Sequence, residues 1–399
     1  MVGSPTTLIV AQSGGPTAVV NASTVGVLRA ARADGRVERV LGARFGVEGI
    51  VADDCVDLTD LTPEQVAALR RTPGAALGSS RHRPTGAVIE AAVADLVKRG
   101  VGWIALVGGN DTAETLHRFH LAADAAGAPI SFVGIPKTID NDLPGMDHAP
   151  GYGSAARYIA LAAREAALDT SAMRRTDPVK IVELMGRNAG WLAAAGSLAR
   201  DKPNDAPQLI FFPERPRSMD QMLEEIRAAH AAHGWAIVMI SENQMDDKGS
   251  PLGGDEPLYI DPHGHAYYES AGTALARTSQ ARLGIRTRYE RPGSLQRTSF
   301  LTLSDVDVDE AESAGAEAAR LALAGASDVM VAIQRAATAD YHVHYTAVPL
   351  ETIAHRERTM PDEFIASSGT DVTDAFVRYA RPLIGGSLPP TCDLLDRSL

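Results

Sequence analysis

Short apolar runs alternate along the chain with longer stretches that suit helices. The first part has three such runs, Leu8–Ala11, Trp103–Val107 and Ile130–Ile135, and each is followed by glycine or polar residues. Helical stretches are expected after the first two, at Ala18–Ala31 and Ala113–Ala126. Buried strands that alternate with helices are typical of a parallel, doubly wound sheet. The pattern therefore predicts an α/β fold for this part of the chain.

The same alternation continues through the second part. The expected elements are a long helix over 149–169, strands near Val179–Leu184, Gln208–Phe212, Ala236–Ile240 and Ile285–Tyr289, and an alanine-rich helix over Ala311–Ala324. A chain of 399 residues with 45% hydrophobic content can bury a large core, and its length suggests two or three lobes.

The polar residues after the run Ile130–Ile135 carry the densest chemistry in the sequence. Lys137, Thr138, Asp140 and Asp142 follow one another within six residues. They are expected at the carboxyl edge of the sheet, where open α/β sheets bind ligands. One carboxylate can accept a proton, the second can hold a metal ion, and the lysine can neutralise a transferring phosphoryl group. A capped turn would explain the Asp and Asn residues equally well if the motif stood alone.

Two glycine turns resemble this site in position. Gly14 and Gly15 follow the first strand, and Gly108 and Gly109 follow the second, with Asp111 at the mouth of the next helix. A glycine turn at a helix N-terminus can cradle phosphate with backbone N–H groups. The sequence matches neither the GxxxxGK nor the GxGxxG pattern. An ordinary βα turn and a helix N-cap are the alternatives for the two sites.

Composition and charge exclude several other classes. The formal net charge is −12, without the basic block of a nucleic-acid binder. Cys55 and Cys392 are far apart, which favours buried or inert thiols over a disulfide framework or a cysteine zinc site. His263 and His265 are expected to be solvated loop residues and not metal ligands. Without a signal-peptide pattern or an apolar run of transmembrane length, a cytoplasmic location is expected.

Taken together, the motifs resemble those of the phosphofructokinase superfamily, and most closely its pyrophosphate-dependent branch. The matching stretches occur in the family's order over nearly the whole chain: SGGPTAVVNAS, GGND, PKTIDND, IVELMGRNAGW, Ser241–Asn243, Arg288, Gln296–Arg297, VPLETIA and RYARPLIG. The resemblance implies two doubly wound lobes with mostly parallel sheets and a cleft between them. It places the donor lobe at 1–150, the sugar-phosphate lobe at 151–305, and a segment packing back across both lobes at 306–399, with a loose tail after 386.

The resemblance also implies a role for each matching residue on the donor side. Asp140 matches the proton acceptor for the sugar 1-hydroxyl, and Thr138 and Asp142 match residues that contact the sugar or hold Mg²⁺. Gly14 matches the residue whose N–H contacts the donor phosphate, and Arg81 matches a donor-side arginine. Gly15 and Gly109 are expected to complete the donor site, and Asn110, Asp111 and Asp142 to ligate Mg²⁺.

Two positions favour pyrophosphate over ATP as the donor. Lys137 matches the lysine of the pyrophosphate branch, where ATP-using relatives typically carry glycine. Asp111 also falls where ATP users have glycine, and a carboxylate there would repel the α-phosphate region of a nucleotide.

On the sugar side, the resemblance implies a set of residues that contact the sugar phosphate: Met185, Gly186, Arg187, Glu242, Arg288, Ser294 and Arg297. The arginines suit this role because a guanidinium binds phosphate in a bidentate manner. In the family, Arg288 reaches across a subunit interface, so a homodimer or homotetramer is implied.

Three positions depart from the family pattern. Asn110 replaces the first aspartate of GGDD, and its amide can ligate a metal only through the neutral carbonyl oxygen. Ser294 replaces a common His or Tyr, which loses a contact or leaves room for a longer sugar. Pro178 stands where some relatives have a sugar-binding arginine, which Lys180, Arg174 or Arg175 could replace.

The implied reaction is reversible, Mg²⁺-dependent phosphoryl transfer from pyrophosphate to the 1-hydroxyl of fructose 6-phosphate. The same chemistry on another ketose phosphate, such as sedoheptulose 7-phosphate, is the first alternative. An ATP-dependent kinase and a non-catalytic regulatory subunit remain as further alternatives.

Overall fold

The chain forms two compact units, and each is built from two separate stretches of sequence. The computed structural model describes residues 5–254, 256–260, 266–338, 340–392 and 395. The first unit contains Met1–Ser154 and Arg297–Arg358, and the second contains Ala155–Gln296 and Thr359–Leu399. Residues 306–399, expected as one returning segment, are thus divided between the two units.

The first unit is organised by a seven-stranded sheet with the order β13-β12-β5-β4-β1-β2-β3. Its five inner strands are mutually parallel, and the edge strands β3 and β13 are antiparallel to their neighbours. The strands are β1 (Thr7–Gln12), β2 (Arg39–Ala43), β3 (Cys55–Asp57), β4 (Val101–Gly108), β5 (Ser131–Pro136), β12 (Val329–Arg335) and β13 (Val343–Pro349).

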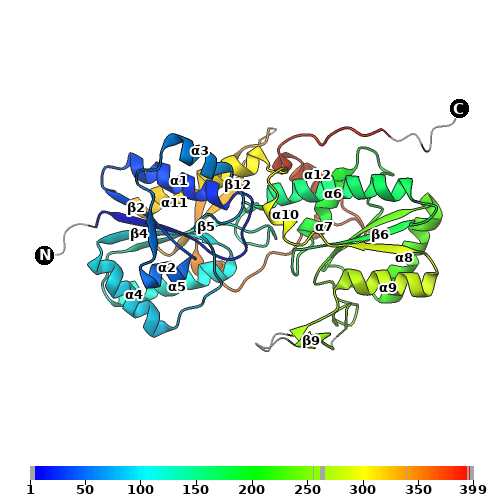
Figure 1. The fold of residues 1–399 in the computed structure, drawn as a ribbon, viewed down its shortest axis with the longest axis horizontal. Helices are drawn as coiled ribbons and strands as arrows, with labels where there is room; N and C mark the ends of the chain where they lie inside the picture. The colour runs from blue at the N-terminus through cyan, green and yellow to red at the C-terminus, as the bar shows by residue number, and fades with distance from the viewer. Residues whose placement is uncertain (1–4, 255, 261–265, 339, 393–394, 396–399) are drawn as a thin grey trace. The chain divides into compact units, whose positions relative to one another are not determined.

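Helices cover both faces of this sheet (Figure 1). One face carries α1 (Val20–Ala33), α3 (Pro63–Arg71) and α11 (Asp305–Leu323), and the other carries α2 (Val47–Ala52), α4 (Gly86–Lys98) and α5 (Asn110–Ala125). Leu8 and Val10 of β1 are buried on the first face, and Ile9 and Ala11 are buried on the second. Because both faces are covered, the central strands are continuously apolar.

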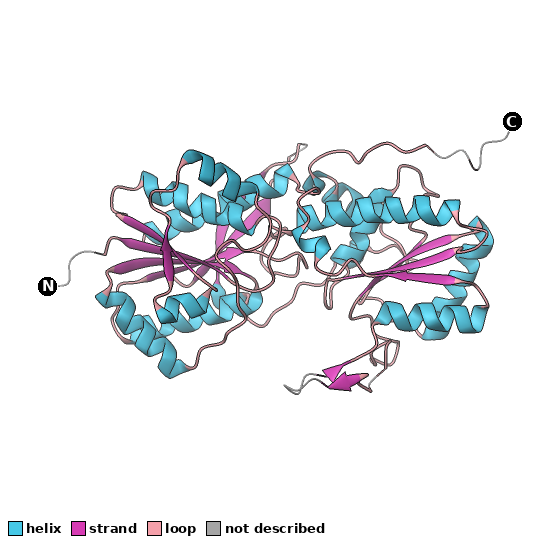
Figure 2. Cartoon of the chain, viewed as in Figure 1, coloured by secondary structure: helices cyan, strands magenta, loops and turns pink. Residues whose placement is uncertain are grey.

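The second unit has a four-stranded parallel sheet with the order β11-β6-β8-β7. Figure 2 shows its strands between layers of helices. The strands are β6 (Val179–Leu184), β7 (Leu209–Phe211), β8 (Ala236–Ser241) and β11 (Thr287–Glu290). The helices are α6 (Tyr152–Ala172), α7 (Trp191–Ala195), α8 (Met219–His233), α9 (Ala271–Leu283) and α12 (Asp374–Ala380).

Smaller elements complete the two units. They are the short helix α10 (Leu295–Thr298), the hairpin of β9 (Tyr259–Ile260) and β10 (Ala266–Tyr267), and the 3-10 turns η1 (Gly196–Ala199), η2 (Leu350–Thr352), η3 (Asp362–Phe364) and η4 (Pro382–Ile384).

The α/β class with mostly parallel sheets, predicted from the sequence, is confirmed. Strand β6 has the predicted bounds, whereas α5 begins three residues before the predicted start. This earlier start places Asn110 and Asp111 in the first turn of the helix. The strands β2, β3, β12 and β13 were not predicted.

Some sequence expectations concern residues at the margins of the fold. His263, His265 and most positions beyond 392 lie outside the described residues.

Both cysteines are free thiols. Cys55 is partly buried, and that burial raises the pKa of its thiol, whereas Cys392 is exposed. Among the described helices, none is both long and apolar enough to span a membrane.

Candidate phosphoryl-transfer site

The chemistry-bearing turns of the first unit follow three adjacent strands. The strands β1, β4 and β5 are neighbours and parallel, so their carboxyl ends meet at one edge of the sheet. The next strand in sequence, β2, lies on the opposite side of β1 from β4. The strand order therefore reverses at β1, and open α/β sheets bind ligands at such a switch point. Gly14, Gly109 and Lys137 each follow one of these three strands.

Lys137 reaches back from the end of β5 to the glycine turn after β1. Its side chain is buried, and its Nζ donates a hydrogen bond to the Gly15 carbonyl at 2.8 Å. Its backbone N–H donates to the Gly108 carbonyl at the end of β4. A Cβ atom on Gly14 would lie 3.3 Å from Lys137 Nζ. The glycine turn thus leaves just enough room for the ammonium group beside it.

A cavity of about 400 Å³ opens beside this turn. It is lined by Gly14, Gly15, Pro16, Ala75, Gly78, Ser79, Ser80, Arg81 and Arg297. Small residues and backbone form most of its wall, and two arginines supply positive charge. This lining suits a compact anion such as a diphosphate.

At this cavity, two of the predicted residues have contacts that the sequence did not indicate. The Gly14 N–H, expected to contact the donor phosphate, donates to the Ser80 carbonyl at 3.2 Å. The Gly14 N–H could therefore donate to a phosphate oxygen only if its hydrogen bond to the Ser80 carbonyl were broken. Arg297, expected among the sugar-phosphate residues, lines this cavity, and its Nη1 would lie 2.9 Å from a Cβ on Gly15.

Gly14→Ala tests the close approach of the turn and the lysine. Gly14 has a φ of +75°, so alanine would be strained there and would also crowd Lys137 Nζ. We expect the KM for pyrophosphate to rise roughly tenfold, as for the loss of one good interaction. Gly127→Ala is a matched control, because Gly127 has a φ of +62° with open space around its Cβ position. Equal KM values in the two variants, measured by steady-state kinetics, would refute the role of the contact.

The turn after β4 brings a carboxylate and an amide to the N-terminus of α5. Asp111 forms an exposed ion pair with Arg83 at 2.7 Å, a partner that the sequence did not single out. The Asn110 amide nitrogen donates to the Arg356 carbonyl. This bond uses the nitrogen, so the carbonyl oxygen is the atom that Asn110 can offer to a metal. No group of three or more His, Cys, Asp or Glu side chains positioned for a metal occurs in the described part of the chain.

The loop between β5 and α6 carries the two aspartates of the main motif. Asp140 is half-buried, and its backbone N–H donates to Thr138 Oγ1 at 3.1 Å, whereas Asp142 is buried. Thr138 donates its backbone N–H to the Pro150 carbonyl at 3.1 Å. The loop therefore closes on itself, and its start is held against its end.

Arg358, which is distant in sequence, holds this loop in place through hydrogen bonds. Its guanidinium donates to the carbonyls of Asn141, Met146 and Asp147, at 2.9, 2.7 and 2.6 Å for the closest atoms. Its backbone N–H donates to the Asp142 carbonyl at 2.6 Å. No local pattern around Arg358 indicates this role, because the contacts span more than 200 residues of sequence.

In the second unit, several predicted sugar-phosphate residues lie at or near the carboxyl ends of strands. Met185, Gly186 and Arg187 directly follow β6, and Glu242 directly follows β8. Gly186 and Arg187 both have positive φ values, which gives a tight bend with an exposed arginine at its tip.

Two residues that the sequence did not assign support this edge of the second sheet. The buried Gln296 accepts a hydrogen bond from the Met185 N–H at 3.2 Å and donates to the Gly293 carbonyl at 2.9 Å. These bonds hold the segment around the exposed Ser294 close to Met185. Arg291 pairs with Glu242 at 3.2 Å.

Arg288 lies apart from these residues. It pairs with Asp177 at 2.8 Å and is adjacent to Lys180, near the amino end of β6. The Arg288 guanidinium lowers the pKa of the Asp177 carboxyl. Lys180, considered as a substitute for the absent arginine, is buried and paired with Asp169 and Glu290.

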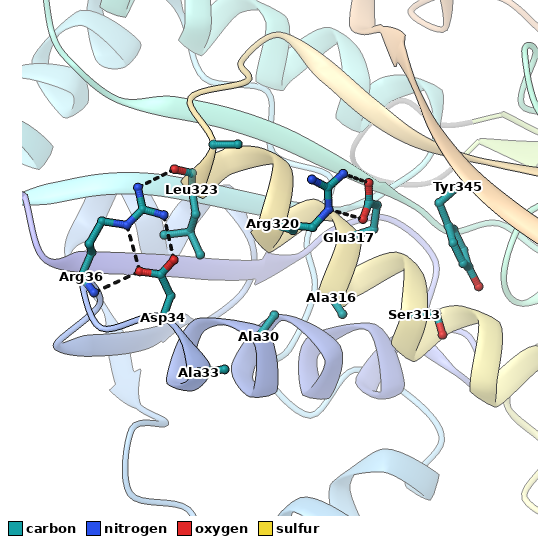
Figure 3. A pocket seen from close by; sticks show the side chains of 11 residues that line it. Ala30, Ala33, Asp34, Arg36, Ser313, Ala316, Glu317, Arg320, Leu323 and Tyr345 are labelled. Atoms are coloured by element: carbon teal, nitrogen blue, oxygen red, sulfur yellow. Dashed lines mark hydrogen bonds and ion pairs between the residues drawn. The ribbon is translucent and has the colours of Figure 1, made fainter.

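A larger cavity of about 610 Å³ lies in the first unit between α1, α11 and β13 (Figure 3). Its lining includes four alanines, and its two arginines already have partners. Arg36 bonds to Asp34 and to the Leu323 carbonyl, and Arg320 bonds to Glu317. It lies where α1 ends, whereas the switch point lies where α1 begins. The cavity at Gly14 is therefore the better candidate for a phosphate site.

Comparison with known proteins gives a consistent result. The family model described as phosphofructokinase matches residues 7–322. A pyrophosphate–fructose 6-phosphate 1-phosphotransferase of Xanthomonas campestris pv. campestris is 39% identical, over 96% of this chain and 92% of its own. The corresponding protein of Rhodospirillum rubrum is 38% identical, over 98% and 96% of the two chains. The crystal structure of the Nitrosospira multiformis pyrophosphate-dependent phosphofructokinase matches with a TM-score of 0.88 at 33% identity, covering 98% of this chain and 95% of that one. The chain belongs to the phosphofructokinase family.

Proposed function

We propose that this protein transfers a phosphoryl group from pyrophosphate to the 1-hydroxyl of fructose 6-phosphate, reversibly and with Mg²⁺. The observation that carries the proposal is the contact of Lys137 Nζ with the Gly14–Gly15 turn, beside a cavity lined by two arginines. The names of the full-length relatives support the same donor and acceptor.

In the proposed mechanism, Asp140 takes the proton of the sugar 1-hydroxyl as its oxygen attacks phosphorus. The bond between the transferred phosphorus and the bridging oxygen breaks, and inorganic phosphate leaves. Lys137, Arg81 and Arg297 stabilise the negative charge that is shared between the attacking and leaving oxygens. Positioning and electrostatics then account for most of the rate enhancement, because little other covalent chemistry is needed.

We propose Asn110, Asp111 and Asp142 as the residues that would hold a divalent metal ion, on the chemistry of their oxygen atoms. Asp111 and Asp142 offer carboxylate oxygens, and Asn110 offers its amide oxygen, which are the ligand types that Mg²⁺ prefers. When bound, Mg²⁺ would neutralise charge on the donor phosphates. The pairing of Asp111 with Arg83 means that this carboxylate must be shared with, or released from, the arginine.

The choice of donor follows from the size and charge of the site. The buried side chain of Lys137 occupies space beside the turn, at a position where ATP-using relatives typically have glycine. Asp111 adds a carboxylate in the first turn of α5. Both features favour a compact diphosphate over ATP.

On the acceptor side, the exposed Ser294 is small enough to admit a longer sugar. Sedoheptulose 7-phosphate is therefore the second acceptor that we propose to test. Arg288 is more than half exposed and lies away from Met185, which fits a role toward another copy of the chain. We propose a cytoplasmic homodimer or homotetramer.

The first test compares pyrophosphate and ATP as donors for fructose 6-phosphate, each with Mg²⁺ and at matched concentrations. Turnover with pyrophosphate alone is expected. Turnover with ATP alone would refute the roles of Lys137 and Asp111 in donor choice. Sedoheptulose 7-phosphate in place of fructose 6-phosphate then tests the acceptor range, and a lack of turnover with every pair, with and without Mg²⁺, would favour a non-catalytic subunit.

A further inference from the structure

A buried histidine in the loop between β5 and α6 lies between two carboxylates. His148 is 1% exposed. Its Nδ1 lies 2.8 Å from Asp147 Oδ2, and its Nε2 lies 2.6 Å from Glu310 Oε2 on α11. Since an ionised carboxylate only accepts hydrogen bonds, both ring nitrogens must carry protons to satisfy this geometry. The arrangement is therefore that of an imidazolium between two anions.

The residues around this pair balance its charges. Arg335, at the end of β12, lies 3.1 Å from Asp147, so that carboxylate has its own counter-charge. Tyr341 donates its hydroxyl to Glu310 at 2.5 Å, and Arg335 lies over the Tyr341 ring. Glu310 is 6% exposed, and among these neighbours His148 is the cation that contacts it. Loss of the histidine charge would leave a buried carboxylate poorly compensated, which is costly.

The same helix also holds the end of the loop directly. Asp307, one turn before Glu310 on α11, accepts hydrogen bonds from the backbone N–H groups of Gly151 and Ser154, both at 2.8 Å. Pro150, between His148 and Gly151, accepts the backbone bond from Thr138 described above. The segment after His148 is thus bonded to Thr138, two residues before Asp140, through the Pro150 carbonyl.

We propose that the buried ion pair between His148 and Glu310 positions the loop that carries Asp140 and Asp142, so that His148 is a positioning residue in its charged form. This rests on the proposed function, because Asp140 is the base of that reaction. His148 itself touches no substrate in this proposal. Its effect comes through the geometry of the loop, where small displacements of a catalytic group cost much rate.

The electrostatics of the cluster give the proposal a pH signature. Burial opposes the charged ring, yet the hydrogen bonds to Asp147 and Glu310 raise the pKa of His148 to about 9. The charged groups that face it are Asp147 and Arg335, with Glu310 and, farther along α11, Asp307, whose pKa is raised by burial. Tyr341 faces it too, and burial raises the pKa of its hydroxyl. Because the folded-state pKa of His148 is raised, its stabilising effect is fully present below pH 6.5 and is lost as the pH rises through about 9.

The decisive experiment measures kcat and KM from pH 6 to 10 for the wild type, Glu310→Gln and Tyr341→Phe. We expect kcat of the wild type to fall near pH 9 while KM for pyrophosphate changes little. Glu310→Gln keeps the shape of the side chain but removes its charge, so the fall should move about one pH unit lower or more. Tyr341→Phe should give a smaller shift. Glu317→Gln, on the same helix but outside the cluster, is the matched control and should follow the wild type.

Two outcomes would overturn the proposal. Equal alkaline limbs in the wild type and Glu310→Gln would show that the pair does not control the loop. A His148 ring resonance that titrates near pH 6.5 by NMR, assigned by its absence in His148→Gln, would show that the ring is not held charged. The NMR titration needs no turnover, so it decides the state of the pair even if wild-type inactivity with pyrophosphate refutes the proposed function.

Discussion

Asp140→Asn is expected to lower kcat by roughly 10²–10⁴-fold, the usual contribution of a positioned general base. Asparagine preserves the size of the side chain but cannot accept the proton of the sugar hydroxyl. The loop around it should be retained, because the contacts of Arg358 and Asp307 that hold it do not involve the Asp140 carboxylate. We therefore expect an unchanged melting temperature and little change in KM for either substrate.

The control for this variant is Asp60→Asn, which changes an exposed carboxylate before α3 in the same unit. Both proteins should show the circular dichroism spectrum of the wild type. Near-wild-type kcat in Asp140→Asn would remove Asp140 from the role of base. Stopped-flow measurement of the single-turnover rate then separates the chemical step from product release.

Lys137→Met should have the second large effect, a fall in kcat/KM for pyrophosphate of roughly 10²–10³-fold. Methionine fills similar space among buried neighbours but removes the ammonium group that contacts the Gly15 carbonyl. The lost charge acts on the transition state more than on the bound donor, so most of the effect is expected in kcat. Steady-state kinetics with each substrate varied in turn would measure this division.

Lys98→Met is the matched control, because Lys98 is exposed at the end of α4. It should leave both kcat and KM unchanged. If Lys137→Met only raises the KM for pyrophosphate and leaves kcat unchanged, the lysine only binds the donor. Full activity in Lys137→Met would remove it from the site.

The same position also tests donor choice. Lys137→Gly combined with Asp111→Gly opens the space beside the turn and removes the carboxylate at the start of α5. An increase in the ratio of ATP to pyrophosphate turnover would agree with selection by these two residues. An unchanged ratio would place donor selection elsewhere in the cavity wall.

The sequence by itself determined the local order of the site. Apolar runs such as Leu8–Ala11 predict strands buried on both faces, and a glycine pair after such a strand suits a phosphate turn as well as an ordinary βα turn. These are properties of neighbouring residues, so they can be predicted without knowing where distant segments lie. The α/β class and the positions of the three chemistry-bearing turns follow from them, whereas the family was indicated by the resemblance of the motifs.

Tertiary structure alone decided which distant groups hold those turns in place. The side chains of Arg358 and Glu310 lie more than 150 residues from the loop residues that they bind. Their roles depend on the return of α11 and the segment after β13 to the first unit, and no periodicity around them indicates this. The edge strands β3 and β13 were missed for a related reason. Their exposed and half-exposed positions weaken the apolar pattern that marks the central strands.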